Sequence, residues 1–156
     1  MLFICLAMAL FASPLQAQSL TPLSELMDGK KGSPYPFVRC SAFYQAYDAW
    51  VGTDQLNRVD PGILINPDQT TASLGQSIST LMRIAEQLRS TNNSESEDQA
   101  RETAVRDKKI IENLYLSHIA TIGVLERAVD PLLLSDLGLC KLITELAVGS
   151  FTSTGR

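Results

Sequence analysis

Two cysteines, Cys40 and Cys140, follow the apolar start of this 156-residue chain and lie a hundred residues apart. Neither belongs to a C-x-x-C pair, and the single histidine of the chain cannot complete a four-ligand zinc site with them. Two cysteines allow only one intramolecular pairing. We therefore predict a disulfide that joins the first and last major helices and stabilises the fold by about 4–5 kcal/mol through closure of a long loop.

The start of the chain, residues 1–17, contains no charged side chain and is typical of a secretory signal peptide. An apolar stretch over residues 2–11 is followed by Pro14 and a small-residue site that ends at Ala17. We predict cleavage after Ala17, loss of Cys5 with the leader, and export to the periplasm or the cell exterior, where thiols oxidise. The apolar run is shorter than the ~20 residues of a membrane span, so no span is expected after processing; an uncleaved anchor is the alternative.

The chain is mildly acidic, with a net charge of −4 and a pI near 4.9. Acidic and basic residues are interspersed and form no basic stripe that could neutralise phosphates, so we set nucleic-acid binding aside. The length suits one domain with one hydrophobic core. We expect this domain over residues 18–149 and a flexible tail over residues 150–156.

Apolar residues recur at steps of three and four along the mature chain, and no alternating strand pattern appears. Capping residues and glycines divide this pattern into segments. The expected helices cover residues 22–28, 34–51, 67–88, 96–128 and 135–148. The sequence therefore predicts an all-α, four-helix-bundle-like domain with a short extra N-terminal helix, clasped by one disulfide.

Residues 89–99 contain no apolar side chain and predict the connector that precedes the long fourth helix. Either Ser94 with Glu97 or Ser96 with Gln99 would cap the start of this helix. Its apolar stripe is expected to follow Ala104, Ile111, Leu114, His118, Ile122 and Leu125. Other apolar residues surround that stripe, so we expect this helix to be the central one.

The helix over residues 34–51 is unusually aromatic. It carries six of the ten aromatic residues of the chain: Tyr35, Phe37, Phe43, Tyr44, Tyr47 and Trp50. Together they cover more of the helix circumference than a single buried stripe needs. One interpretation is packing alone; the other is a binding surface formed by Tyr44, Tyr47 and Trp50 together with His118, because Tyr and Trp are enriched at interfaces.

His118 is the only histidine, and it could act as a general base, a metal ligand or a pH switch. The simpler interpretation is a hydrogen-bonded histidine at the edge of the core. Ser117 points about 100° away from it on a helix, and no G-x-S-x-G motif is present. The sequence also contains no pattern for a metal, haem or nucleotide cofactor.

We therefore expect a small exported, non-enzymatic binding or accessory protein of the cell envelope. It would dock an envelope protein through an exposed patch at Tyr44, Tyr47 and Trp50. The alternative is a small-molecule-binding bundle with a pocket between the aromatic helix and His118. A third hypothesis is a hydrolase-type enzyme that uses His118. The sequence specifies no cofactor and no oligomeric state.

Overall fold

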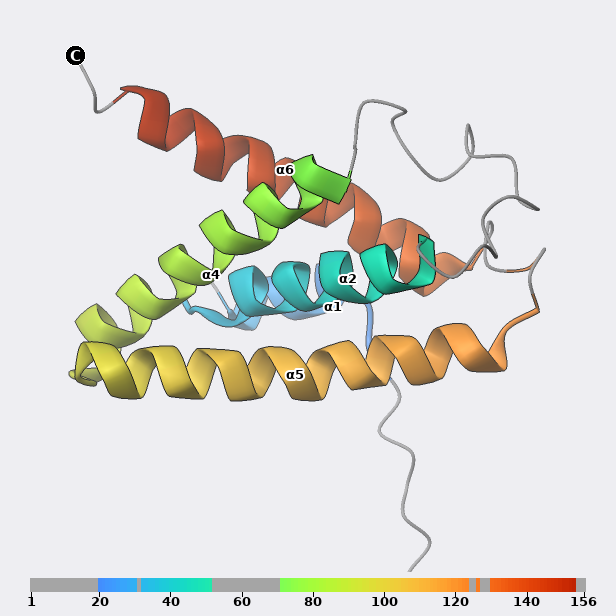
Figure 1. Cartoon of the computed structure of the whole chain (residues 1–156), viewed down its shortest axis with the longest axis horizontal. Coiled ribbons are helices and arrows are strands. Elements are labelled where there is room, and N and C mark those ends of the chain that lie inside the picture. The colour runs from blue at the N-terminus through green and yellow to red at the C-terminus, as the bar shows by residue number, and fades with distance from the viewer. Residues whose placement is uncertain (1–19, 31, 52–70, 124–125, 127–129, 154–156) are drawn as a thin grey trace, which may run out of the picture.

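The structure is a computed structural model that describes residues 20–30, 32–51, 71–123, 126 and 130–153. Within these ranges every regular element is helical (Figure 1). The elements are α1 (Leu23–Leu26) with the 3-10 turn Met27–Gly29, α2 (Tyr35–Val51), α4 (Thr71–Asn93), α5 (Glu97–Thr121) and α6 (Pro131–Ser153). The predicted all-α class is confirmed. The expected leader and the expected helix start at Pro67 lie outside the described residues.

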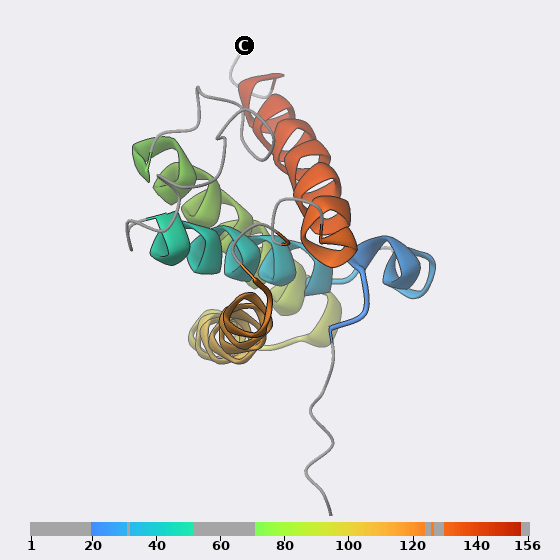
Figure 2. The ribbon, with the colours of Figure 1, turned by 90° about the vertical axis from the view of Figure 1, so that its right-hand side faces the viewer.

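The helix at the centre of the fold is α2, which packs against α4, α5 and α6 (Figure 2). Among its described side chains only Ala49 is exposed. The prediction that the long helix would be central is wrong, because α5 lies on the outside and exposes Val105 and Ile110. A helix that is buried over most of its circumference has almost no polar face, so its apolar pattern looks less regular than that of an outer helix.

The buried stripe of α5 consists of Ala100, Ala104, Ile111, Tyr115 and Ile119, with the side chain of Glu112 beside it. Ala104 and Ile111 were expected on this stripe; beyond them it is displaced by one residue, to Tyr115 and Ile119. Of the residues predicted to lie on it, Leu114 and His118 are only partly buried.

The turn between α4 and α5 is much shorter than the predicted connector. The first of the two helices continues to Asn93, and the second begins at Glu97. Ser94 takes a left-handed conformation with φ 56°, which reverses the chain. Ser96 and Gln99 form the capping box, which confirms the second of the two predicted alternatives. A stretch without apolar side chains can still be helical where its residues face solvent.

The ends of the last two helices also differ from the prediction. The first of them, α5, ends at Thr121 rather than near residue 128, because Ile122 adopts an extended backbone. The last helix, α6, begins at Pro131, where Asp130 Oδ1 accepts a hydrogen bond from the Leu133 N–H at 2.9 Å. Asp130 and Pro131 are thus the cap and first residue of the helix, not a break before it. The helix continues through Gly149 to Ser153, so residues 150–153 are helical rather than a tail.

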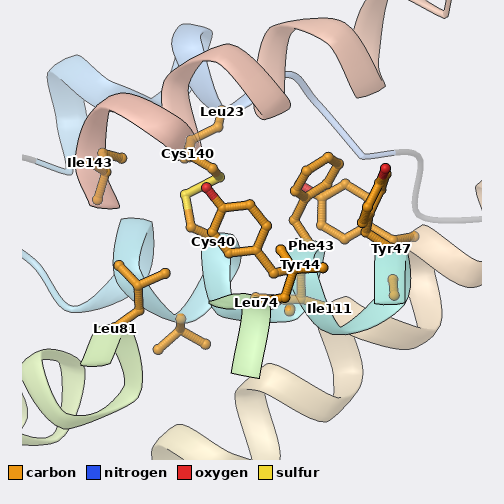
Figure 3. Packing of buried hydrophobic residues seen from close by; sticks show 14 of the residues in the cluster. Leu23, Cys40, Phe43, Tyr44, Tyr47, Leu74, Leu81, Ile111, Cys140 and Ile143 are labelled. Atoms are coloured by element: carbon orange, nitrogen blue, oxygen red, sulfur yellow. A yellow bond between two sulfur atoms is a disulfide. The ribbon is translucent and has the colours of Figure 1, made fainter. Parts of the chain in front are cut away.

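The predicted disulfide is present and joins α2 to α6 in the middle of the core (Figure 3). The Cα atoms of Cys40 and Cys140 are 5.2 Å apart, and both residues are fully buried. One turn after Cys40 on α2, the ring of Phe43 meets that of Tyr115 edge to face, with 5.3 Å between centroids. The disulfide and this aromatic pair belong to the same hydrophobic core.

Candidate functional site

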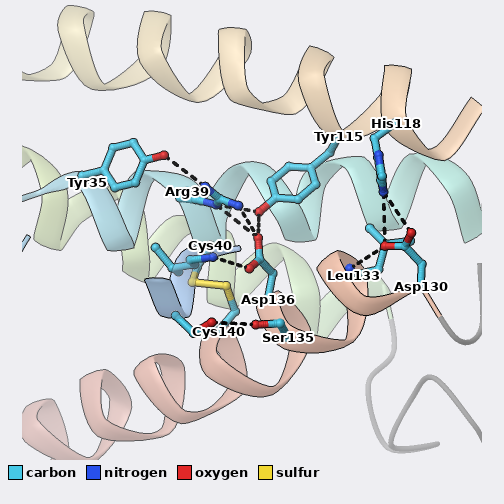
Figure 4. Close-up of polar contacts among 12 residues, drawn as sticks. Tyr35, Arg39, Cys40, Tyr115, His118, Asp130, Leu133, Ser135, Asp136 and Cys140 are labelled. Atoms are coloured by element: carbon cyan, nitrogen blue, oxygen red, sulfur yellow. Dashed lines mark hydrogen bonds and ion pairs between the residues drawn. A yellow bond between two sulfur atoms is a disulfide. The ribbon is translucent and has the colours of Figure 1, made fainter. Parts of the chain in front are cut away.

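The core contains a buried cluster of charged and polar side chains that the sequence analysis missed (Figure 4). Arg39 of α2 and Asp136 of α6 are 1% and 0% exposed, and Arg39 Nη2 lies 2.6 Å from Asp136 Oδ2. Tyr115 of α5 donates its hydroxyl proton to the same carboxylate oxygen and accepts a bond from Arg39 Nε at 2.8 Å. Asp136 Oδ1 accepts the Leu23 N–H at 2.7 Å, so the carboxylate also caps α1.

The protonation states in this cluster are fixed by its surroundings. Burial alone would lower the pKa of Arg39, but the neighbouring Tyr115 and Asp136 raise that pKa above its ordinary value. Burial, and then the negative charge of Asp136, raise the pKa of Tyr115. Arg39 therefore stays positive and Tyr115 keeps its proton. The three side chains are closed to solvent and bonded to one another, which suits a structural joint rather than a place where substrate could bind.

The sequence contains a signal for this cluster. Arg39 lies within a largely apolar helix, and Asp136 follows three leucines and a serine. Charged residues are almost never fully buried without a partner. Opposite charges one and four residues before the two disulfide cysteines, each on a mostly apolar segment, are therefore compatible with an ion pair next to the disulfide.

The expected binding surface at Tyr44, Tyr47 and Trp50 is not exposed. The three side chains are at most 6% exposed and belong to the core. A gap of about 10 Å³ lies among Tyr47, Trp50 and four other apolar side chains, and it holds at most one water molecule. The aromatic residues of α2 therefore pack the core, and neither an exposed docking patch nor a ligand pocket is found at this place.

His118 lies on the last turn of α5, apart from this aromatic group. Its Nε2 atom is 3.2 Å from both carboxylate oxygens of Asp130, the residue that caps α6. The imidazole thus links the end of one helix to the start of the next (Figure 4). His118 lines neither the small gap nor the groove described below. The edge-of-core interpretation fits this geometry.

A groove of about 540 Å³ lies between the C-terminal halves of α4 and α6, where the two helices diverge on the left of Figure 1. Six apolar side chains form most of its wall: Phe37, Ile84, Leu88, Ile143, Leu146 and Ala147. Gln87 and Thr91 of α4 supply the polar part of the lining. We refer to this feature as the α4–α6 groove.

A second, polar cavity of about 220 Å³ lies next to the α4–α6 groove, on the other side of Gln87 and Thr91 of α4. Its lining consists of Arg83, Glu86, Gln87, Ser90, Thr91, Glu97 and Arg101, which belong to α4 and α5. Gln87 and Thr91 line both spaces. The apolar groove and this charged cavity are therefore neighbours that share one polar ridge. No sequence pattern could reveal them, because they depend on how three helices are splayed.

The described residues contain no cluster of three or more histidine, cysteine, aspartate or glutamate side chains placed to hold a metal ion. Among the described helices, none combines the length and apolar character that crossing a membrane requires. In comparisons with known proteins, no family model, no curated protein and no solved structure matches the chain. The α4–α6 groove and the polar cavity beside it are therefore the candidate binding sites.

Proposed function

We propose that the protein is an exported, non-enzymatic binding protein of the cell envelope that holds a hydrocarbon chain in the α4–α6 groove. The observation that carries this proposal is the groove itself. Its volume of about 540 Å³ lies within the roughly 300–1,000 Å³ of small-molecule sites, and its wall is mostly apolar with two polar side chains. Export is supported by the apolar leader and by a disulfide between distant helices, which persists in oxidising compartments.

The size of the groove favours a small ligand over a partner helix. An α-helix is about 10 Å across and rises about 5.4 Å per turn, so roughly one turn would fill a space of 540 Å³. A helix that docks in a groove normally presents anchors over two turns, at positions i, i+3, i+4 and i+7. A single hydrocarbon chain needs no such length of wall.

Docking of an envelope protein remains the second candidate, at a different place from the one expected. Leu134 and Leu142 are exposed on one face of α6, and Gly138 lies between them with open space around it. A partner could approach α6 closely along this face. We do not propose catalysis, since the imidazole of His118 is engaged by Asp130 and, within the part of the chain that the structure describes, no side-chain nucleophile is bonded to either of them.

The binding test uses two leucines of α6 that are similarly exposed. Leu146 lines the groove, whereas Leu142 does not. The uncharged fluorescent probe N-phenyl-1-naphthylamine should bind the wild-type protein and be displaced by dodecanol. Leu146→Lys should weaken the binding about fivefold or more, because it brings a charge to the apolar wall.

The matched control, Leu142→Lys, should leave the affinity for the probe unchanged within a factor of two. Absence of probe binding, or equal effects of the two substitutions, would overturn the groove as the binding site. The export part is tested separately, by intact mass spectrometry of protein from the native host. The mature chain should begin at Gln18, and an alkylating reagent should modify neither Cys40 nor Cys140 before reduction. Retention of Met1 together with free thiols at Cys40 and Cys140 would contradict export.

A further inference from the structure

The geometry points to a single-chain zwitterionic amphiphile as the ligand, with its tail in the α4–α6 groove and a phosphate-and-amine head group in the polar cavity. This inference rests on the proposed function and names the class of molecule that it binds. A lysophospholipid has this chemistry. The juxtaposition that carries it is the ridge of Gln87 and Thr91, which lines the apolar groove on one side and the charged cavity on the other.

The polar cavity holds equal numbers of opposite charges. Arg83 and Arg101 supply two guanidinium groups, and Glu86 and Glu97 supply two carboxylates. A purely anionic head group would meet both carboxylates, and a purely cationic one would meet both guanidinium groups. A head group with one phosphate and one amine satisfies both signs, because guanidinium binds phosphate with two parallel bonds and carboxylate accepts from ammonium.

The ion pair between Arg101 and Glu86 is weak enough for each side chain to exchange its partner for a ligand group. Arg101 Nε lies 3.7 Å from Glu86 Oε2, and the Arg101 side chain is 65% exposed. Exposed pairs at such a distance contribute little to stability, so a phosphate can replace the carboxylate without loss of the fold. Arg101 can then turn to the phosphate while Glu86 accepts from the amine.

The shared ridge suits the junction between tail and head group. Thr91 donates its hydroxyl proton to the Gln87 carbonyl oxygen at 2.8 Å, which leaves the hydroxyl lone pairs free to accept. The exposed carboxamide of Gln87 offers both a donor and an acceptor. A ligand hydroxyl or ester, as found between the chain and the phosphate of a lysophospholipid, can bond to both groups.

The test compares four molecules that share a twelve-carbon chain and differ in head group, each titrated calorimetrically below its micelle concentration. Dodecylphosphoethanolamine is zwitterionic with a primary ammonium, dodecyl maltoside is uncharged, laurate is anionic and dodecylammonium is cationic. Dodecylphosphoethanolamine should bind about tenfold more tightly than the other three, as expected for charge-assisted bonds at the head group.

Arg101→Gln should remove most of this preference, because the affinity for dodecylphosphoethanolamine should fall much more than the affinity for dodecyl maltoside. The matched control is Arg106→Gln, since Arg106 is equally exposed on α5, at 66%, and lies outside the cavity. Circular dichroism of both variants confirms that the fold is retained.

The outcomes separate the two proposals. Binding of all four molecules with equal affinity, or tightest binding of laurate or the cationic molecule, would overturn the zwitterionic ligand and leave the groove intact. An unchanged preference in Arg101→Gln would also overturn it. If none of the four binds, the proposed function fails together with this inference.

Discussion

Arg39 of α2 and Asp136 of α6 are joined by a 2.6 Å ion pair, and each lies close in sequence to one half of the disulfide. Arg39 directly precedes Cys40, and Asp136 lies one helical turn before Cys140. The covalent link and the ionic link therefore join the same turns of the same two helices. Through its other bonds the carboxylate also reaches α1 and α5, so four elements meet at this point.

Asp136→Asn should lower the free energy of unfolding by about 3–5 kcal/mol, because it leaves the buried guanidinium of Arg39 without its countercharge. Urea unfolding followed by circular dichroism measures the loss. Asp107→Asn, which removes the partly exposed partner of Arg89, is the control and should cost about 1 kcal/mol or less. A loss below 1 kcal/mol for Asp136→Asn would show that the buried pair is not maintained in solution.

The double variant Arg39→Met with Asp136→Leu should be more stable than Asp136→Asn alone. It removes both charges and fills their space with apolar side chains, which is often neutral for a buried pair. If the double variant is instead the less stable of the two, the hydrogen bonds to Tyr115 and Leu23 contribute more than the ion pair itself.

Replacement of Cys40 and Cys140 by alanine should lower the free energy of unfolding by about 4 kcal/mol, because the unfolded chain regains the freedom of a long loop. The measurement is urea unfolding with and without a reductant. The reductant should destabilise the wild-type protein by a similar amount and leave the double variant unchanged. Equal stability of the oxidised wild type and the variant would show that the crosslink contributes nothing.

Stability should fall at alkaline pH through the buried tyrosines. Burial raises the pKa of Tyr47 to about 12, and the pKa of Tyr115 is raised as well. The pKa of tyrosine in an unfolded chain is about 10, and below this pH the buried tyrosines contribute fully to the free energy of unfolding. As the pH rises further, the unfolded state releases these protons first, so the free energy of unfolding falls by up to ~1.4 kcal/mol per pH unit for each tyrosine.

Tyr47→Phe should make this alkaline decline shallower between pH 10 and 12. At pH 7 it should change stability by less than about 0.5 kcal/mol, because the Tyr47 hydroxyl has no hydrogen-bond partner among the described residues. Tyr44→Phe is the comparison, since it removes the bond from the Thr144 hydroxyl at 3.3 Å and should cost about 1 kcal/mol. An unchanged alkaline slope in Tyr47→Phe would contradict the raised pKa.

Ser96→Ala should lower the free energy of unfolding by about 1 kcal/mol, since it removes the capping bond to the Gln99 N–H. Ser94→Gly should have the opposite sign and raise it by about 0.5–1 kcal/mol, because glycine adopts a φ of 56° without strain. Thermal unfolding of both variants measures the difference. Destabilisation by Ser94→Gly would contradict the left-handed turn.

The parts of the fold that the sequence predicted are those encoded by local chemistry. The capping box at Ser96 and the pairing of two distant cysteines each follow from a few residues. The sequence did not predict which helix is central, because the burial of nearly all of α2 depends on the helices that pack around it. Asp130 and Pro131 fall in the gap between the expected helices over residues 96–128 and 135–148, although the same pair is a strong helix start.

The site was less predictable than the fold. Aromatic side chains on α2 suggested a binding surface, but Tyr44, Tyr47 and Trp50 are large enough to fill the core and do so. The α4–α6 groove has no counterpart in the sequence, since leucine and isoleucine at helical spacing look the same whether they line a core or a cleft. Its existence depends on the angle between two helices.

The covalent and ionic links of α6 to the rest of the protein lie in the first half of the helix. Asp136 and Cys140 fasten it to the centre of the protein, and residues 141–153 extend about 20 Å beyond that joint. Over this length the helix contacts the core through the buried side chains of Ile143 and Ala147 and through the hydrogen bond from the Thr144 hydroxyl to Tyr44. Ile143, Leu146 and Ala147, which α6 contributes to the wall of the α4–α6 groove, lie beyond both of these links. A change in the width of the groove would therefore break neither the disulfide nor the buried ion pair.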